Sequence, residues 1–311
     1  MNTDAWYIIV NPAAGNGSAK KRWALYADKV LAALPQGSTV AFTHHRGHGI
    51  ELAQHAIAEG FRRIIAVGGD GTHHEITNGI LSQSVCPSAS VTYALLPVGT
   101  GNDWMRTYRI PRKLDAWIDM IQQGHMRFQD VAKVSYHHNG HQQYRYGVNV
   151  IGLAYDAFIA HYSDRYKKWV FNGLVYMLMI LRCLFVYKLV KLRVTFDGKS
   201  EEDYFYTINA GLCKYSGGGM SLVPHAVPDD GLIALTLARR LTKLGVIFNT
   251  YRFYNDTIGQ HPKIDTYQAR HITVEAAAAS PTYVEADGEF LGETPVEISI
   301  VEGALKVIAP R

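Results

Sequence analysis

A short glycine-rich stretch decides the fold, and it reads Val67-Gly68-Gly69-Asp70-Gly71-Thr72. The apolar run Arg63–Val67 leads into it, and the amphipathic segment His73–Leu81 follows. A strand, a tight turn and a helix in this order form the unit from which parallel α/β sheets are built. Glycines let backbone N–H groups turn toward an anion, and the N-terminus of the following helix adds partial positive charge. The stretch therefore predicts a phosphate-binding loop.

Two further loops have the same design. They read Val10-Asn11-Pro12-Ala13-Ala14-Gly15-Asn16-Gly17 and Pro97-Val98-Gly99-Thr100-Gly101-Asn102-Asp103. One such loop alone is more often only a tight turn, but three at successive strand ends favour a nucleotide site, because the carboxyl ends of parallel strands meet at one edge of the sheet. A dinucleotide fingerprint is excluded, since it would need glycine where Lys20 stands, and no Walker A motif occurs.

The first half of the chain alternates β-rich runs with amphipathic segments. The runs and segments are Trp6–Val10, Ser18–Leu34, Ser38–Thr43, Ile50–Glu59, Arg63–Val67, His73–Leu81 and Val91–Leu96. Alternation of this kind indicates βαβ units around a parallel sheet. We predict an N-terminal Rossmann-like, three-layer α/β domain over residues 1–130.

After about Asp130 the pattern changes to longer alternating runs separated by Gly, Pro and Asp-Gly. These runs are Asp130–Tyr136, Tyr144–Val150, Leu189–Phe196, Tyr204–Leu212, Leu232–Ala238, His271–Ala277, Thr282–Ala286 and Val296–Val301. Such punctuation is typical of antiparallel sheets. We predict a β-rich C-terminal domain over residues 131–311, an antiparallel β-sandwich with helices inserted around 153–186 and 242–255, whose last strand could return to the first domain.

The most hydrophobic stretch, Trp169–Val190, is interrupted by Asn172, Arg182 and Lys188. A bilayer span needs about 20 predominantly apolar residues, so we predict one long helix instead. Two interpretations stay open for it: a buried helix of the second domain, or a surface that leans on a membrane.

Composition excludes several classes of protein. The 31 Lys and Arg residues against 27 Asp and Glu give a net charge of +4, too mild for a nucleic-acid binder. Three widely separated cysteines predict neither a disulfide framework nor a zinc site. The N-terminus lacks the basic and apolar regions of a signal peptide, so a cytoplasmic protein is expected.

In order and spacing, these motifs resemble the soluble diacylglycerol kinase-like lipid kinases, whose relatives include sphingosine kinases and, more distantly, NAD kinases. The resemblance is carried by the three loops, by Glu75 and Asn78-Gly79, and further on by Pro228-Asp229-Asp230-Gly231-Leu232 and Asp287-Gly288-Glu289. It covers nearly the whole chain. It implies an ATP-dependent kinase that phosphorylates a hydroxyl of diacylglycerol or a related lipid.

The resemblance also implies a set of nucleotide-contacting residues: Asn11, Thr43, Gly68, Gly69, Asp70, Gly71, Thr72, Gly99, Thr100, Asn102 and Asp103. Asp70 and Asp103 would then lie near the triphosphate, where repulsion calls for a cation, and Mg²⁺ is the natural choice. The competing interpretation of these two aspartates is helix N-capping.

Two later motifs carry roles implied by the resemblance. Asp287 would act as the general base that accepts the proton of the acceptor hydroxyl; from the residues alone, Thr282–Leu291 is a hairpin whose Asp-Gly is the turn. Asp230, with the carbonyls of Val227 and Leu232, would hold a structural Mg²⁺, and a simple turn is the alternative there.

Several questions stay open at this level. Many relatives carry lysine where Asn16 stands, so Lys20, Lys21 or Arg22 would have to supply positive charge, and His73 or His74 could touch the nucleotide. The alternatives are an NAD kinase-like phosphotransferase and a catalytically silent nucleotide-binding regulator. The expected partners are ATP and a lipid acceptor at or from the membrane surface, with no nucleic acid; a homodimer and peripheral location at the inner membrane surface are left open.

Overall fold

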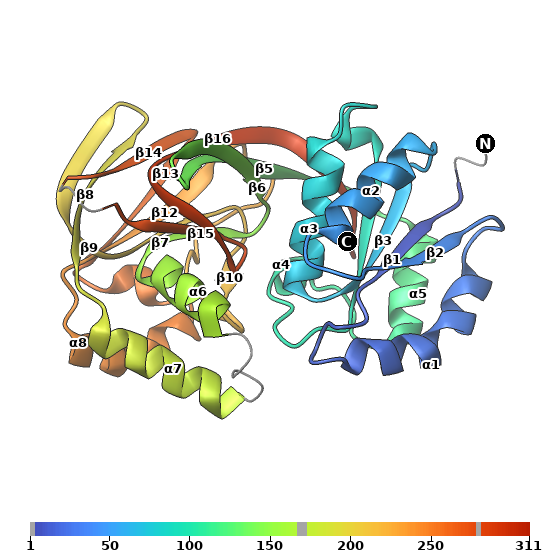
Figure 1. The fold of residues 1–311 in the computed structure, drawn as a ribbon, viewed down its shortest axis with the longest axis horizontal. Coiled ribbons are helices and arrows are strands. Elements are labelled where there is room, and N and C mark those ends of the chain that lie inside the picture. Colours follow the sequence, from blue (N-terminus) through green and yellow to red (C-terminus); the bar gives the residue numbers. More distant parts are fainter. Residues whose placement is uncertain (1–3, 167–172, 278–280) are drawn as a thin grey trace. The chain divides into compact units, whose positions relative to one another are not determined.

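The computed structural model describes residues 4–166, 173–277 and 281–311 (Figure 1). The chain divides into two compact units. Unit 1 comprises Met1–Val131 together with Glu302–Arg311, and unit 2 comprises Ala132–Val301. The division after Val131 is one residue beyond the expected boundary. The segment Glu302–Arg311 belongs to unit 1, which agrees with the return of the last strand that the sequence had left open.

Unit 1 alternates strands and helices. Its elements are β1 (Tyr7–Val10), α1 (Ser18–Ala33), β2 (Thr39–Phe42), α2 (His48–Ala58), β3 (Arg63–Gly68), α3 (Asp70–Ser82), η1 (Ser88–Ser90), β4 (Thr92–Pro97), α4 (Trp104–Tyr108), α5 (Leu114–Gln123) and the start of β5 (Met126–His138). β1 pairs in parallel with β2 and with β3, and β3 pairs in parallel with β4. These pairings run the strands in the order β4-β3-β1-β2.

The parallel strands of unit 1 are buried along their length. All residues of β1 and β4 are buried, as is β3 after Arg63. Strands covered on both faces become continuous apolar runs, which is why the sequence shows Ile and Val runs here rather than strict alternation. The carboxyl ends of β1, β3 and β4 therefore reach one edge of the sheet together, and each continues into one of the glycine-rich loops.

Unit 2 is built from antiparallel strands. They are the rest of β5, β6 (His141–Gly147), β7 (Val150–Ala154), β8 (Val190–Phe196), β9 (Lys199–Gly211), β10 (Tyr215–Ser216), β11 (Met220–Ser221), β12 (Ile233–Arg239), β13 (Ile264–Ala269), β14 (His271–Ala276), β15 (Tyr283–Ala286) and most of β16 (Glu289–Ile308). β9 pairs with β7, β8 and β12, and β15 joins β7 to β16. The C-terminal end of β16 lies in unit 1, where Lys306 and Val307 pair in parallel with β4.

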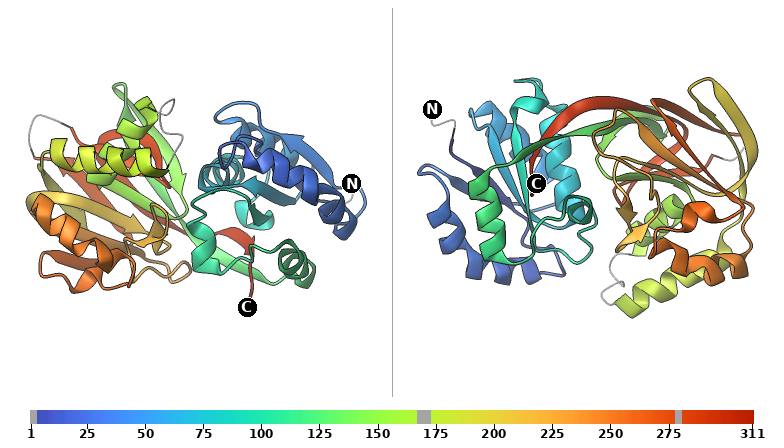
Figure 2. Two further views of the ribbon diagram at one scale, coloured as in Figure 1. Left: turned by 90° about the horizontal axis from the view of Figure 1, so that it is seen from below. Right: turned by 180° about the vertical axis from the view of Figure 1, so that it is seen from behind.

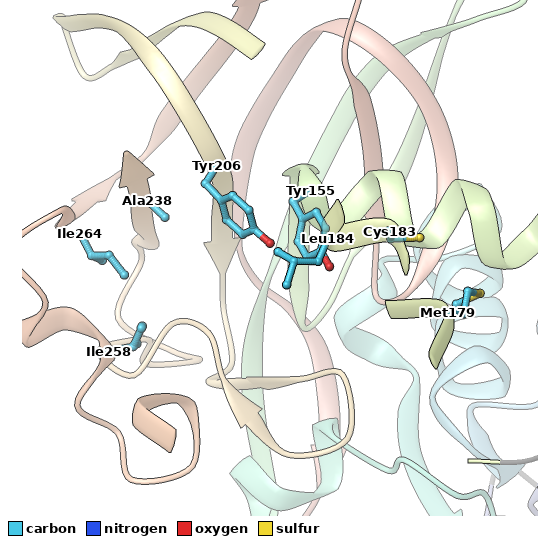
Figure 3. Packing of buried hydrophobic residues seen from close by; sticks show 8 residues of the cluster. All are labelled: Tyr155, Met179, Cys183, Leu184, Tyr206, Ala238, Ile258 and Ile264. Atoms are coloured by element: carbon cyan, nitrogen blue, oxygen red, sulfur yellow. The ribbon is translucent and has the colours of Figure 1, made fainter. Parts of the chain in front are cut away.

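The helices of unit 2 are α6 (Tyr155–Tyr166), α7 (Gly173–Val186) and α8 (Lys243–Asn249), followed by the short turns η3 (Thr250–Phe253) and η4 (Ile258–Gln260). They cover one apolar cluster, part of which Figure 3 shows. α7 contributes Met179, Cys183 and Leu184 to it, and β9 contributes Tyr206. The partly buried Val246 of α8 packs against the same cluster, so α7 and α8 share a core.

The mixed α/β architecture with a β-rich C-terminal part is confirmed, and some details differ from expectation, among them two in unit 2. The run Tyr144–Val150 is not one strand: β6 ends at Gly147 and β7 begins at Val150. The break is stabilised because the N–H groups of Val148 and Asn149 bind the Asp287 carboxylate instead of a strand partner. β13 was missed, since polar Asp265, Thr266 and Gln268 obscure its short apolar pattern.

The helix expected over Trp169–Val190 lies partly outside the described residues, because 169–172 are not among them. Its described part ends at Val186, and β8 begins at Val190. Among the helices that the structure describes, none has both the length and the apolar character of a bilayer span.

Candidate active site

The loop between β3 and α3 is shaped by steric limits at its glycines. A Cβ at Gly68 would lie 2.2 Å from Oγ1 of Thr72, so no larger residue fits. The Thr72 hydroxyl accepts a hydrogen bond of 2.9 Å from Nδ2 of Asn11, which lies in the loop after β1. Asn11 in turn donates its backbone N–H to the carbonyl of Val67 at 3.0 Å. The first two loops are therefore tied together by the predicted residues Asn11, Gly68 and Thr72.

The loop after β4 lies directly against the loop after β3. A Cβ at Gly99 would come within 2.4 Å of the Gly69 Cα, and the N–H of Gly99 donates to the Gly68 carbonyl at 3.1 Å. The N–H of Asp103 donates to Oδ1 of Asp70 at 2.7 Å. The structure thus brings Gly68, Gly69 and Asp70 together with Gly99 and Asp103.

The loop after β1 has an unusual backbone that accounts for Asn16. Gly15, Asn16 and Gly17 have φ values of 59°, 54° and 81°, three successive residues in the left-handed region. Asparagine is among the non-glycine residues that enter this region most readily. A Cβ at Gly15 would lie 3.1 Å from the Val98 carbonyl, so this loop also approaches the loop after β4. Asn16 fits a conformational requirement that lysine would meet less well.

Asp70 and Asp103 form a close pair of acidic side chains. Burial, and next the neighbouring Asp103 carboxylate, raise the pKa of Asp70 to about 6, against the lowering effect of hydrogen bonds from the Asp103, Asn102 and Trp104 N–H groups. Arg106 lies 3.5 Å from Asp103. Gly69 occupies the N-cap of α3, and Asp103 at the N-cap of α4 makes no side-chain capping bond of its own. The start of α4 is instead capped by the Asp70 carboxylate, which accepts the Asp103 N–H. The N-capping interpretation is therefore wrong for the helix that each aspartate begins, whereas Asp70 does cap the neighbouring helix α4.

The amide of Asn102 lies beside this pair of aspartates. Its Nδ2 donates to the Gly99 carbonyl at 2.7 Å, whereas its buried Oδ1 has no hydrogen-bond partner among the described residues. A buried oxygen that accepts no hydrogen bond, together with two neighbouring carboxylates, forms a set of hard oxygen ligands that suits Mg²⁺. The residues present therefore fit the cation that the resemblance implies.

A pocket of about 290 Å³ opens beside these loops. It is lined by Ser18, Arg22, Tyr26, Pro97, Gly99, Thr100, Asn102 and Arg112. No hydrogen bond or ion pair of the Arg22 or Arg112 guanidinium is found with the residues that the structure describes. Arg22 was one of the candidates for positive charge, and Arg112 was missed, because nothing in the sequence signals that residue 112 lies beside residue 22.

Two predicted contacts look different in the structure. Thr43 follows β2, is buried, and donates its N–H to the Val10 carbonyl at 2.9 Å, but it does not line this pocket. His73 is a core residue: Nδ1 lies 2.7 Å from the Tyr93 hydroxyl, and its ring packs on Trp104 with centroids 4.3 Å apart. His74 is buried as well. The suggestion that one of these histidines touches nucleotide is therefore not supported.

In unit 2, Asp287 occupies the turn between β15 and β16. Asp287 and Gly288 have φ values of 55° and 85°, as a tight hairpin requires. Asp287 is only 8% exposed, and its carboxylate accepts hydrogen bonds from the N–H groups of Val148 at 3.1 Å, Asn149 at 2.9 Å and Val150 at 3.2 Å. Its orientation is thereby fixed. The hairpin expected over Thr282–Leu291 is present, so the turn and the proposed catalytic role concern the same residue.

Glu285, which the sequence did not single out, lies two residues before Asp287. Its Oε2 accepts the Gly288 N–H at 2.7 Å. Burial first, and then the charges of Asp156 and Asp287, raise the pKa of Glu285 well above its ordinary value. Burial also raises the pKa of Asp156. Glu285 therefore favours the neutral acid and adds little negative charge beside Asp287.

Asp230 lies in an exposed turn before β12. Its Oδ1 accepts the Leu232 N–H at 3.0 Å, and its Oδ2 accepts Nε2 of Gln268 at 3.1 Å. The first bond is that of an Asx turn, which is the alternative considered for this motif. A cation held by Asp230 with the Val227 and Leu232 carbonyls would share the carboxylate with the Leu232 N–H and Gln268, and its presence stays a prediction.

Comparison with known proteins agrees with these motifs. The diacylglycerol kinase catalytic domain family matches residues 5–134, and the YegS C-terminal NAD kinase beta sandwich-like domain family matches residues 149–309. The chain is 28% identical over 306 residues to diacylglycerol kinases of Staphylococcus aureus strains RF122 and MRSA252, covering 98% of this chain and 92% of each relative. A crystal structure of a diacylglycerol kinase from Bacillus anthracis is 25% identical, with a TM-score of 0.72, over 100% of this chain and 98% of that one.

These matches, together with the three glycine-rich loops, define a phosphotransferase that uses an alcohol group as acceptor. More particularly, the chain belongs to the diacylglycerol kinase-like lipid kinase family.

Proposed function

We propose that this protein transfers the γ-phosphate of ATP, with Mg²⁺, to a hydroxyl of diacylglycerol or a related lipid. The observation that carries the proposal is the convergence of three glycine-rich loops on the acidic pair Asp70 and Asp103 within a kinase family. In the reaction the acceptor oxygen forms a bond to the γ-phosphorus while the bond to the β,γ-bridging oxygen breaks, and ADP leaves.

Unit 1 is proposed to handle the nucleotide. Backbone N–H groups of the loops containing Gly68–Thr72 and Gly99–Thr100 would bind phosphate oxygens, with Asn11 and Thr43 nearby. Asp70, Asn102 and Asp103 would hold Mg²⁺, which when bound offsets negative charge on the triphosphate. The raised pKa of Asp70 supports this assignment, because a bound cation would offset the burial and, next, the repulsion from Asp103 that raise it.

In unit 2, Asp287 is proposed to accept the proton that the lipid hydroxyl loses as it attacks phosphorus. Three backbone N–H groups hold this carboxylate in one orientation, which is what a positioned base needs. Asp230 with the Val227 and Leu232 carbonyls remains a proposed structural Mg²⁺ site. Access of the enzyme to the inner membrane surface is part of the proposal, and a homodimer stays open.

Asn16 stands where many relatives carry a positively charged lysine. We further propose that Arg22 and Arg112 supply this positive charge. Both line the pocket beside Thr100 and Asn102, and their guanidinium groups find no partner among the described residues. A guanidinium can donate two parallel hydrogen bonds to a phosphate, so two of them suit a triphosphate better than one flexible lysine.

The variant Arg112→Gln is expected to raise the KM for ATP by about 10- to 100-fold, because a charge-assisted hydrogen bond is worth roughly 1.5–3 kcal/mol. Lys113→Gln is the matched control, because Lys113 is the exposed neighbour that does not line the pocket. Steady-state kinetics with varied ATP and fixed lipid measure both. Equal effects of the two substitutions would remove Arg112 from the proposed site.

The proposed function is tested by offering γ-labelled ATP and Mg²⁺ to a panel of lipids in mixed micelles, with NAD in a parallel reaction. Labelled product in the organic phase is the expected result, and it also identifies the acceptor. NAD is included because the C-terminal family is described as NAD kinase-like. Label on NAD alone would contradict the lipid assignment, and no product with intact ATP binding would indicate a regulatory nucleotide-binding protein.

A further inference from the structure

Helices α7 and α8 both present large apolar side chains to solvent. Figure 1 and the right-hand view of Figure 2 place the two helices along the same edge of unit 2. We define the α7/α8 surface by six exposed residues: Leu178, Phe185 and Val186 of α7, Leu244 and Phe248 of α8, and Tyr251 of the adjoining turn η3. Phe185 is 59% exposed and Phe248 is 74% exposed. Several large apolar side chains this exposed on two helices along one edge of a unit mark an interaction surface.

This exposure is not a requirement of the fold. α7 already buries Met179, Cys183 and Leu184 in the apolar cluster of unit 2, so these residues are enough to pack the helix onto the core. In the same way α8 uses Val246 for the core, while Leu244 and Phe248 point outward. The two helices are joined at their ends, where the Lys243 ammonium donates to the Phe185 carbonyl and lies 5.6 Å from the Phe185 ring. The outward apolar sides therefore belong to one connected surface.

The charge on these segments has one sign. Residues 178–190 and 241–255 contain no Asp or Glu, whereas Arg182, Lys188, Lys243 and Arg252 lie within them. Arg182, Lys188 and Lys243 are exposed. Apolar side chains among basic ones are the pattern of a helix that lies in the interface of an anionic bilayer, with its apolar residues among the acyl chains and its cations at the headgroups.

We propose that the α7/α8 surface docks unit 2 onto an anionic phospholipid bilayer. The proposal rests on the lipid kinase function, since a substrate that resides in a membrane gives such a surface its use. Phe185 and Phe248 would enter the acyl region, and Lys188 and Lys243 would contact phosphate groups of the lipids. The contact is peripheral, in line with the finding that no described helix is long and apolar enough to span a bilayer.

The test is co-sedimentation of the full chain with vesicles of phosphatidylcholine, with or without phosphatidylglycerol. We expect binding to the vesicles that contain phosphatidylglycerol, with a loss of about tenfold or more in the double variant Phe185→Ser/Phe248→Ser. The control is Leu25→Ser/Val85→Ser, which removes two apolar residues of unit 1 that are 79% and 54% exposed and should bind as the wild type does. Lys188→Gln should weaken binding about fivefold, and only where phosphatidylglycerol is present.

Two further readouts separate the outcomes. Transfer to a short-chain diacylglycerol in detergent micelles should be unchanged in the Phe185/Phe248 variant, because the chemistry is elsewhere. Wild-type protein that phosphorylates micellar lipid but does not bind the vesicles would overturn the docking surface and leave the proposed function intact. Vesicle binding without any kinase activity would overturn the proposed function and leave the docking surface intact. A variant that binds vesicles normally but shifts from dimer to monomer in ultracentrifugation would assign the surface to a second copy of the chain and overturn the proposal.

Discussion

Replacing Asp287 by Asn is expected to lower kcat for lipid phosphorylation by about 10²–10⁴-fold, the range that a positioned general base contributes. The KM for ATP should change little, because the nucleotide residues lie in unit 1. The substitution is not purely chemical, however. The amide could still accept the N–H groups of Asn149 and Val150 through its oxygen, but its NH₂ would face the N–H of Val148. We expect a stability loss of about 1–3 kcal/mol from that unpaired donor.

The chain contains a matched control for this structural effect. Asp197-Gly198 forms the turn between β8 and β9 with φ values of 44° and 83°, close to those of Asp287-Gly288. The Asp197 carboxylate likewise accepts backbone N–H groups, from Arg270 and His271. Asp197→Asn should therefore lower thermal stability with little change in kcat. Equal losses of kcat in both variants would mean that Asp287 is only a turn residue.

The order of elements in unit 1 was predictable because local chemistry and burial agree there. Apolar runs such as Arg63–Gly68 end at glycines, which are required because no larger side chain fits there. The sequence shows both the runs and the glycines directly. The helix that follows was placed three residues late, at His73 instead of Asp70, because Asp70-Gly71-Thr72 has the composition of a loop. That the three loops meet at one edge followed from the parallel sheet topology, whereas the particular contacts, such as Asn11 with Thr72 and Gly99 with Gly69, did not.

What the sequence could not give are contacts that depend on tertiary distance. Arg112 reaches the pocket through the path of the chain after α4, which no local pattern encodes. Glu285 appears as an ordinary polar position in a strand, and only its burial near Asp156 gives it an unusual pKa. The break between β6 and β7 is fixed by Asp287, nearly 140 residues further on. Each of these features is set by a partner remote in sequence.

Replacing Asp70 by Asn is expected to stabilise the fold at neutral pH while it impairs the enzyme. The pKa of Asp70 is about 6 in the folded chain against 3.8 for an ordinary aspartate. A raised folded-state pKa means that ionisation costs stability: the cost is absent well below pH 4, grows as the pH rises toward 6, and is constant above about 7. Removing the charge should therefore add about 2 kcal/mol at pH 7.5, after allowance for partial exposure, and much less at pH 4.

The amide can preserve the bond from the Asp103 N–H, so the loop should keep its shape. Its neutral oxygen is nonetheless a poorer ligand for a divalent cation than a carboxylate, and we expect the Mg²⁺ concentration for half-maximal activity to rise about 10–100-fold. Calorimetry at both pH values and a Mg²⁺ titration of activity measure the two effects on one protein. A variant that is less stable than the wild type at pH 7.5 would contradict the argument that burial and the Asp103 charge make ionised Asp70 costly, and an unchanged Mg²⁺ requirement would remove Asp70 from the cation site. Gain of stability together with loss of Mg²⁺ affinity is the combination expected where a buried charge is retained for its ligand rather than for the fold.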